Sequence, residues 1–298
     1  MRYAAVGIAL TLAASAAAQP PRWLSDLDAA RAQAARENRD VYLYFTGSDW
    51  CIYCRKMDAE IHATPEFRRL AAERFVLVAV DFPRNRPLQP AQEQKNRVLM
   101  AQYGVAGFPT VILLDSKGRA YGRTGYLEGG WEKTAEQLEA IAQWRQWLSE
   151  AVEEAEKAQG PDRARKLDEV LDRLQIMRLP CTANLDIVRR IIDADPDNQA
   201  ALRGKYTVLV RLSEAEAVSA LGRHQEAVGM VEAVVREVRP EGNLLQECLF
   251  FRAQFIRRSG NLTAAMQAYQ AARDCAPEGP RVAAIREAME ELSGRKPR

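Results

Sequence analysis

The sequence predicts an α/β domain, with a mixed central sheet flanked by helices, followed by an all-α domain. The first observation is that short runs of β-branched and aromatic residues alternate with helical segments up to residue 158. The second is that nearly every segment after Gly160 has helical periodicity. Alternating strands and helices are typical of a covered sheet, whereas successive helices pack on one another. With 298 residues, the chain is long enough for two domains of common size.

Four segments of the first part have the composition of strands. They include the apolar runs VYLYF and FVLVAVDF and lie at 41–45, 75–82, 110–115 and 119–126. Helical patterns surround them, at 24–38, 52–62, 91–103 and 131–158. A further helix starts at Thr64-Pro65, where Thr64 can cap the helix and Pro65 suits its first turn. The last two strands follow each other through a tight turn, which predicts a mixed sheet.

The second part of the chain reads as a series of helices separated by proline and glycine. They are expected at 162–177, 184–193, 199–221, 225–238, 244–258, 262–275 and 281–292. One segment, YTVLVRL at 206–212, is compatible with a strand or a helix. We therefore divide the chain into a domain at 19–150 and a helical domain at 151–298.

The first 18 residues have the pattern of a secretory signal peptide. Arg2 is their only charge, residues 3–18 are apolar or small, and Ala16-Ala17-Ala18 forms a cleavage site before Gln19. The apolar run is shorter than the roughly 20 residues that span a bilayer, although an uncleaved anchor stays an alternative. We expect a periplasmic or secreted protein.

Charge and cysteine content exclude two classes of protein. The 42 basic and 40 acidic residues nearly cancel, so the chain lacks the one-sided positive charge of a nucleic-acid binder. Five cysteines are too few for a small domain held together by disulfides, and their odd number leaves at least one unpaired within the chain. They are Cys51, Cys54, Cys181, Cys248 and Cys275.

Cys51 and Cys54 follow a strand and a turn and open a helix. The free N–H groups and dipole of a helix N-terminus stabilise a thiolate, which is the attacking species in disulfide exchange. Cys51 is the expected nucleophile, and Cys54, one turn further, the expected resolving thiol. A zinc site would need about four ligands, and the chain has no second close cysteine pair and only two histidines, His62 and His224. A structural disulfide stays an alternative.

Residues 41–126 resemble the thioredoxin superfamily. The segment Trp50-Cys51-Ile52-Tyr53-Cys54 matches the WCxxC motif of that family, and Phe108-Pro109-Thr110 matches its cis-proline loop. The stretch from 45 to 67 is similar to exported thioredoxin-like domains and to the carboxy-terminal domain of the transmembrane thiol–disulfide interchange reductases. The resemblance implies a thioredoxin-like α/β fold for the first domain.

The resemblance also implies roles for residues outside the cysteine pair. A cis Pro109 would lie against the two cysteines, leave the backbone at Phe108 and Thr110 free to bind an extended substrate, and keep metal ions off the thiols. Trp50 would form part of the docking surface. No cofactor or metal is implied.

Some positions depart from the family pattern. Phe45 stands where thioredoxins carry a buried aspartate that accepts the proton of the second cysteine, so water or Asp49 is expected to take that role. The middle dipeptide Ile52-Tyr53 contains no histidine, which favours a reducing or isomerising protein. Arg55 and Lys56 either add positive potential or are solvated helix charges, and His62 is expected at the surface or as a helix cap.

The helical part contains two segments related by an offset of 38 residues. Gly222 aligns with Gly260 and Ala227 with Ala265, in a pattern similar to the tetratricopeptide repeat. Such helices either dock a peptide or protein partner or serve as a scaffold. In a tetratricopeptide-like hairpin Cys248 and Cys275 would be close enough for a disulfide, with Cys181 free.

Two functions are compatible with these patterns. The first is an exported thiol–disulfide oxidoreductase that acts on protein disulfides, receives electrons from a membrane-bound donor, and docks a partner on its helical domain. The second is a binding scaffold in which the cysteine pair is structural.

Overall fold

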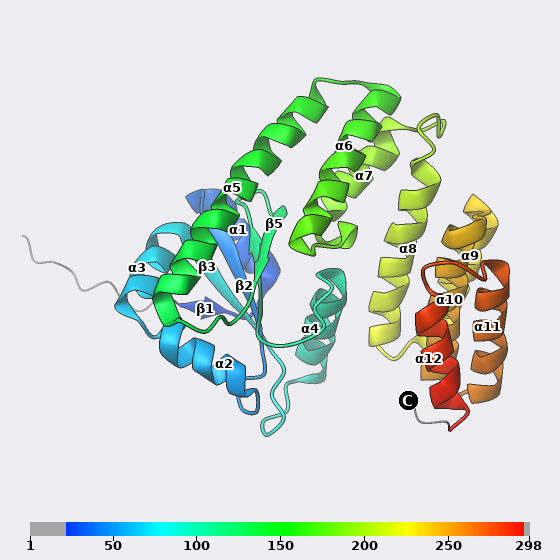
Figure 1. Ribbon diagram of the computed structural model, residues 1–298, viewed down its shortest axis with the longest axis horizontal. Helices are drawn as coiled ribbons and strands as arrows, with labels where there is room; N and C mark the ends of the chain where they lie inside the picture. Colours follow the sequence, from blue (N-terminus) through cyan, green and yellow to red (C-terminus); the bar gives the residue numbers. More distant parts are fainter. Residues whose placement is uncertain (1–21, 295–298) are drawn as a thin grey trace, which may run out of the picture.

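A computed structural model describes residues 22–294 and contains a five-stranded sheet followed by helices (Figure 1). The sheet order is β1-β3-β2-β4-β5. β1 (Trp23–Leu24), β3 (Phe75–Asp81) and β2 (Asp40–Thr46) are parallel, and β4 (Thr110–Leu114) and β5 (Ala120–Thr124) are antiparallel. The mixed sheet is therefore confirmed. The signal peptide expected at 1–18 lies outside the described residues.

β2 is the central strand, and all seven of its residues are buried. Its aromatic residues cover both faces of the sheet, because successive residues of a strand point to opposite sides. Tyr42 contacts Phe67 on one face, and Phe45 contacts Tyr103 on the other. An apolar run buried on both faces is what made this strand recognisable in the sequence.

The helices of the first part lie close to the expected bounds. They are α1 (Leu27–Glu37), α2 (Ile52–Met57), α3 (Pro65–Arg74), α4 (Pro90–Gln102) and α5 (Gly130–Glu156). Thr64 caps α3 as expected, because its hydroxyl accepts the Phe67 N–H at 3.2 Å. After Met57 the chain continues as a π-helical turn, η1 (Asp58–His62), which the sequence pattern did not predict.

The second part is helical throughout its described length. It contains α6 (Gly160–Leu174), η2 (Gln175–Met177), η3 (Cys181–Asn184), α7 (Leu185–Ala194), α8 (Arg203–Ala220), α9 (His224–Val238), α10 (Gly242–Arg258), α11 (Leu262–Cys275) and α12 (Val282–Leu292). The ambiguous segment 206–212 lies within α8 and is helical.

The two aligned segments of the helical part have the same local build. Gly222 and Gly260 each lie just after a helix. Their φ angles are positive, 78° and 88°, a conformation in which a residue with a side chain would be strained. Ala227 and Ala265 are both fully buried. α8 packs on α9, and α10 on α11, as two hairpins of equivalent design.

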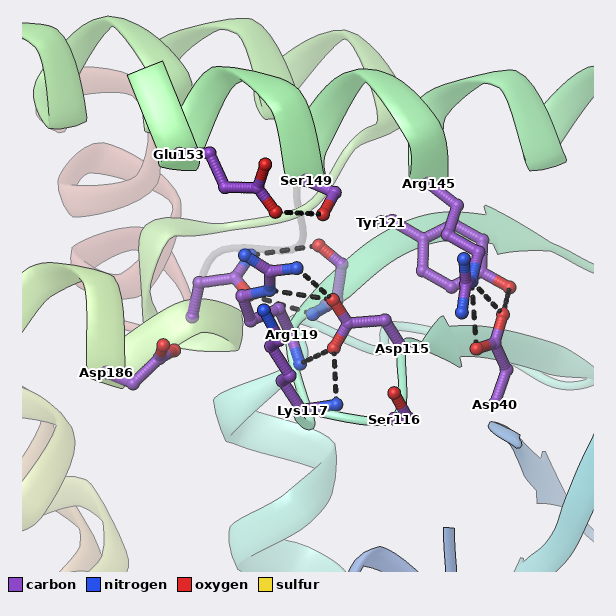
Figure 2. A network of polar contacts seen from close by, with 12 residues as sticks. Asp40, Asp115, Ser116, Lys117, Arg119, Tyr121, Arg145, Ser149, Glu153 and Asp186 are labelled. Carbon is purple, nitrogen blue, oxygen red and sulfur yellow. Dashed lines mark hydrogen bonds and ion pairs between the residues drawn. The ribbon is translucent and has the colours of Figure 1, made fainter. Parts of the chain in front are cut away.

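A polar network joins the sheet to α5 and to the start of the helical part (Figure 2). Asp115 and Arg119 form a buried ion pair in the turn between β4 and β5. Asp40 at the start of β2 binds Arg145 of α5 and the hydroxyl of Tyr121. These contacts fix the edge of the sheet beneath α5.

Asn184 connects the helical part to the sheet edge directly. Its side chain accepts the Ala120 N–H at 2.8 Å and donates to the Ala120 carbonyl at 3.0 Å. One apolar core runs from the sheet through α5, α6 and α7 to Tyr206, and a second fills the hairpins. Position 150 falls inside α5, and the division at 150 stays a prediction.

Candidate active site

Cys51 and Cys54 are joined as a disulfide at the start of α2, with Cα atoms 5.2 Å apart. Cys51 is the N-cap residue, and its sulfur accepts the Cys54 N–H at 3.2 Å. Cys51 is 6% exposed, whereas Cys54 is fully buried. The arrangement gives solvent and substrates access to Cys51 first and keeps Cys54 one turn behind it.

The turn before the pair is held by Gly47. Its carbonyl accepts the N–H groups of Trp50 and Cys51, at 3.2 and 2.9 Å. A Cβ atom at position 47 would lie 2.5 Å from the Trp50 ring, so only glycine lets this ring fold back on the turn. Trp50 donates its indole N–H to the carbonyl of Phe82 at 2.8 Å. Sequence reasoning identified a turn before the cysteine pair but missed this role of Gly47.

The Phe108–Pro109 peptide bond is cis, as the resemblance implied. The Phe108 ring stacks on Phe82 at 5.1 Å and contacts Trp50 at 5.9 Å, which places the cis-proline loop beside the cysteine helix. Gly125 approaches the loop closely, because a Cβ there would lie 2.8 Å from the Pro109 carbonyl oxygen. Gly125 is a second site residue that sequence reasoning missed.

Thr110, expected to bind substrate, begins β4 and is buried. Its hydroxyl donates to the carbonyl of Gly107 at 2.8 Å, so the side chain closes the cis-proline loop on itself. Any contact of Thr110 with a substrate would therefore involve its backbone.

The carboxylate of Asp49 is not available as a proton acceptor for Cys54, because it binds backbone amides. Its carboxylate accepts the backbone N–H groups of Arg84, at 2.9 and 3.1 Å, and of Asn85, at 2.6 Å. These bonds, the one from Arg84 foremost, hold the pKa of Asp49 below its usual value. A carboxylate already occupied by two amides is a poor proton acceptor. Phe45, at the position of the family's aspartate, is fully buried.

The side chain of His62 is packed against the sheet, and the expectation of a surface or capping residue was wrong. Its side chain is 6% exposed and lies against Trp23, Tyr44 and Phe67. Its two ring nitrogens bond to the Tyr42 hydroxyl, at 3.1 Å, and to Asp58, at 2.9 Å. The reason is that β2 presents tyrosine hydroxyls to this face, where an imidazole finds hydrogen-bond partners. The Tyr44 hydroxyl also bonds the Cys54 carbonyl, at 3.4 Å.

The rim of the site carries exposed apolar and basic side chains. Ile52 and Tyr53 are 62% and 56% exposed. The Lys56 ammonium lies about equally far from the Tyr53 and Tyr126 rings, at 6.0 and 5.8 Å. The Tyr126 hydroxyl donates to Glu60 at 2.7 Å, and this bond raises the pKa of Tyr126 to about 12. Arg55 is exposed, and its guanidinium donates to the backbone carbonyl of Asp49.

The remaining cysteines are free thiols. The expected bridge between Cys248 and Cys275 is not formed in the structure, and Cys181 is half-buried. Burial raises the pKa of the Cys248 thiol to about 12, so it is a poor nucleophile. Between residues 22 and 294 no cluster of three or more histidine, cysteine or acidic side chains could hold a metal ion. Over the same range no helix combines the length and the apolarity that crossing a bilayer requires.

Comparisons with known proteins point to one family. The thioredoxin-like domain family matches residues 27–141. Disulfide bond reductase DsbH of Chlamydia pneumoniae is 40% identical over 95 residues, which are 32% of this chain and 57% of that protein. Thioredoxin-related protein DsbJ of the same organism is 29% identical over 103 residues, 35% of this chain and 30% of that protein. The chain thus spans little more than half of the first relative and less than a third of the second.

Two solved structures are similar to the same part of the chain. A DsbH oxidoreductase has 33% identity and a TM-score of 0.40, over 46% of this chain and 94% of that chain. A thioredoxin from Thermus thermophilus has 25% identity and a TM-score of 0.33, over 41% of this chain and 88% of that chain. The family match agrees with the mixed sheet and with the cysteine pair at a helix start. Residues 27–141 of the chain form a thioredoxin-like domain.

Proposed function

We propose that this protein is a thiol–disulfide oxidoreductase that reduces or isomerises protein disulfides through Cys51 and Cys54. The observation that carries the proposal is the asymmetry of the pair. Cys51 caps the helix and reaches the surface, and Cys54 is fully buried behind it. The names of the relatives, a disulfide bond reductase and a thioredoxin-related protein, support the same activity.

The proposed reaction is two successive thiol–disulfide exchanges. The Cys51 thiolate attacks one sulfur of a substrate disulfide, the substrate S–S bond breaks, and the other substrate sulfur leaves as a thiolate that takes a proton. The Cys54 sulfur, after losing its proton, attacks Cys51 and releases the second substrate thiolate. Two electrons pass from the cysteine pair to the substrate, and the pair ends as the disulfide seen in the structure.

The loop at Phe108–Thr110 is proposed to dock the substrate chain. A proline at 109 has no N–H, so the backbone on either side of it is open to an extended partner. Trp50 supports this loop through its contact with Phe108 and forms the neighbouring surface. Water is proposed to accept the Cys54 proton, because Asp49 is occupied by backbone amides.

We further propose that the protein is exported, that a membrane-bound donor keeps the pair reduced, and that the hairpins α8–α11 form a tetratricopeptide-like surface for a protein or peptide partner. The signal-like pattern of residues 1–18 supports export. An oxidising compartment would otherwise hold the pair as a disulfide, which is why a reductase there needs a donor.

The proposal is tested by reduction of insulin disulfides with dithiothreitol as the electron source. Wild-type protein is expected to accelerate insulin precipitation, and Cys51→Ser to lose the acceleration because no nucleophile remains. Cys181→Ser is the matched control, a cysteine-to-serine change in a half-buried thiol outside the site, and should behave as wild type. Equal rates for wild type and Cys51→Ser would reject the enzyme and favour the scaffold.

A further inference from the structure

A small cavity adjoins the cysteine pair and has no role in the exchange described above. Its volume is about 250 Å³. Its walls come from the turn before Cys51 and from the loop after β3, and they include Trp50, Phe82, Pro83, Arg84, Pro87 and Leu88. Pockets for whole small molecules measure about 300–1,000 Å³, so a cavity of this size suits a single side chain.

The position of the cavity relates it to the substrate chain. Trp50 and Phe82 line it, and the same two rings hold Phe108, the residue before the cis proline. A substrate strand lying along Phe108 therefore passes the mouth of the cavity. Successive side chains of a strand point to opposite sides, so a residue flanking the substrate cysteine can point into it.

The walls are apolar, but the rim is positively charged. The Arg84 guanidinium lies 3.8 Å from the centre of the Trp50 ring and forms no ion pair with any described carboxylate. Glu93 and Arg97, which also line the cavity, neutralise each other at 2.6 Å. The Asp49 carboxylate accepts the backbone amides of the same loop, keeps its negative charge and offsets part of the positive charge of the rim.

The positive charge extends beyond the cavity. Arg86 in the same loop is exposed, as are Arg55 and Lys56 on α2, and within residues 22–294 none of the three forms an ion pair. With Arg84 these cations outnumber Asp49 and Glu60, the carboxylates that the rim contacts above include. Unpaired charges of one sign around a binding site attract partners of the opposite sign. A substrate segment that approaches Cys51 is thus favoured when it is acidic.

We propose that the Trp50–Arg84 cavity is a specificity subsite. It takes an apolar side chain next to the substrate cysteine, and its rim selects protein disulfides whose flanking residues are acidic. The inference rests on the proposed function, since it concerns the substrate of the same cysteine pair. Arg84 serves as the specificity-determining residue, because it closes the cavity by stacking on Trp50 and presents its charge to the substrate.

The test uses short peptides whose single cysteine is bonded to mercaptoethanol, which adds no charge. One peptide has the sequence Glu-Phe-Cys-Glu, the second Lys-Phe-Cys-Lys and the third Glu-Gly-Cys-Glu. Full-length protein is reduced, freed of excess reductant and mixed with each peptide, and the second-order rate of peptide reduction is measured by quenching and chromatography. Bis(2-hydroxyethyl) disulfide serves as a small neutral substrate.

The acidic peptide is expected to react about tenfold faster than the basic peptide, since several exposed charges each contribute a few-fold. Arg84→Glu should bring this ratio close to one. The ratio divides the rates of two peptides measured with the same protein variant. A change in the intrinsic reactivity of the Cys51 thiolate alters both rates equally and does not change the ratio. Arg69→Glu is the matched control and should keep the wild-type ratio, because Arg69 lies exposed on α3 and forms no ion pair with the residues that the structure describes.

The apolar part of the proposal is tested by the third peptide and by Leu88→Trp, which fills the cavity. The Phe peptide should react severalfold faster than the Gly peptide in wild type, and Leu88→Trp should remove that difference. Equal rates for all three peptides would overturn the inference and leave the proposed function intact. No reaction with any peptide or with the small disulfide would reject the proposed function itself.

Discussion

Cys51 and Cys54 lie one helical turn apart, and their different burial assigns them different chemistry. A sulfur at the N-cap faces substrates and receives the helix N–H groups, as the bond from Cys54 N–H shows. A fully buried sulfur can react only with a partner that is brought to it. The order of the two exchanges follows from this difference in access.

Replacing Cys54 with serine should separate the two exchanges. Cys51 keeps its position and can attack, but no thiol remains to release the substrate, so a mixed disulfide is expected to accumulate. Non-reducing electrophoresis with a protein substrate would reveal it as a band that dithiothreitol removes. The same band in Cys51→Ser would contradict the assignment of the nucleophile.

His62 contributes to the site through the structure beneath it. The imidazole fills a space among aromatic rings and bonds both Tyr42 and Asp58. We expect His62→Ala to lower the free energy of unfolding by about 2–4 kcal/mol, from the lost packing and the unpaired Tyr42 hydroxyl. Urea denaturation measures it. His224→Ala, at the start of α9, is the control, and an equal loss there would refute the special role of His62.

At the scale of elements, the turn between β2 and α2 sets the direction of the cysteine helix. The Gly47 carbonyl accepts two backbone hydrogen bonds, and the missing side chain leaves space for the Trp50 ring. Both contacts fix the orientation of α2 relative to β2. The π-helical turn that follows α2 brings His62 onto the sheet face. These short irregular segments position the site more than the regular elements do.

Gly47→Ala tests the turn. The added methyl would overlap the Trp50 ring, and we expect a loss of about 1–3 kcal/mol in unfolding free energy together with slower insulin reduction. Thermal and urea unfolding give the first quantity. Gly229→Ala is the control, since nothing lies within 4 Å of a Cβ there, and it should not destabilise the protein. If Gly47→Ala behaved like Gly229→Ala, the close packing of Trp50 on the turn would be disproved.

The regular elements could be predicted from the sequence, and the irregular ones could not. β2 and β3 are apolar runs buried on both sides, and the long helices have clear periodicity. β1 has only two residues, too few for a pattern, and exists because Trp23 and Leu24 pair with β3. The CxxC motif and the cis proline were predictable from motifs. The burial of His62 and the contacts of Asp49 depend on distant residues, and no local pattern contains them.

At the scale of the whole molecule, the sheet and the first helices of the second part form one packed unit. Asn184 acts at the sheet edge as a neighbouring strand would, because it both accepts from and donates to the backbone of Ala120. α4 also packs against α8, so the helical hairpins contact the domain that carries the cysteine pair (Figure 1). Edge strands that are covered in this way are protected from pairing with other chains.

Asn184→Ala tests this unit. The change leaves two buried backbone groups of Ala120 without partners, and we expect a cost of about 2–4 kcal/mol, seen as earlier unfolding of the whole sheet. Asn261→Ala is the matched control. It removes only the N-cap of α11 and should cost about 1 kcal/mol without affecting insulin reduction. If Asn184→Ala left the unfolding of the sheet unchanged, the bonds to Ala120 would not couple the two parts of the chain.

α5 runs without interruption from Gly130 to Glu156, from the cysteine-bearing domain into the helical part. A helix turns by about 100° for each residue, so the number of residues in α5 also sets the rotation of the following helices about its axis. Removing one residue beyond Arg145 would rotate the following part of the chain by about a quarter-turn around the axis of α5. Asn184 would then lose its position beside Ala120 of β5. The chain thus tolerates changes of length in its surface loops far better than in α5. The number of residues in this helix sets the orientation of the hairpins relative to Cys51.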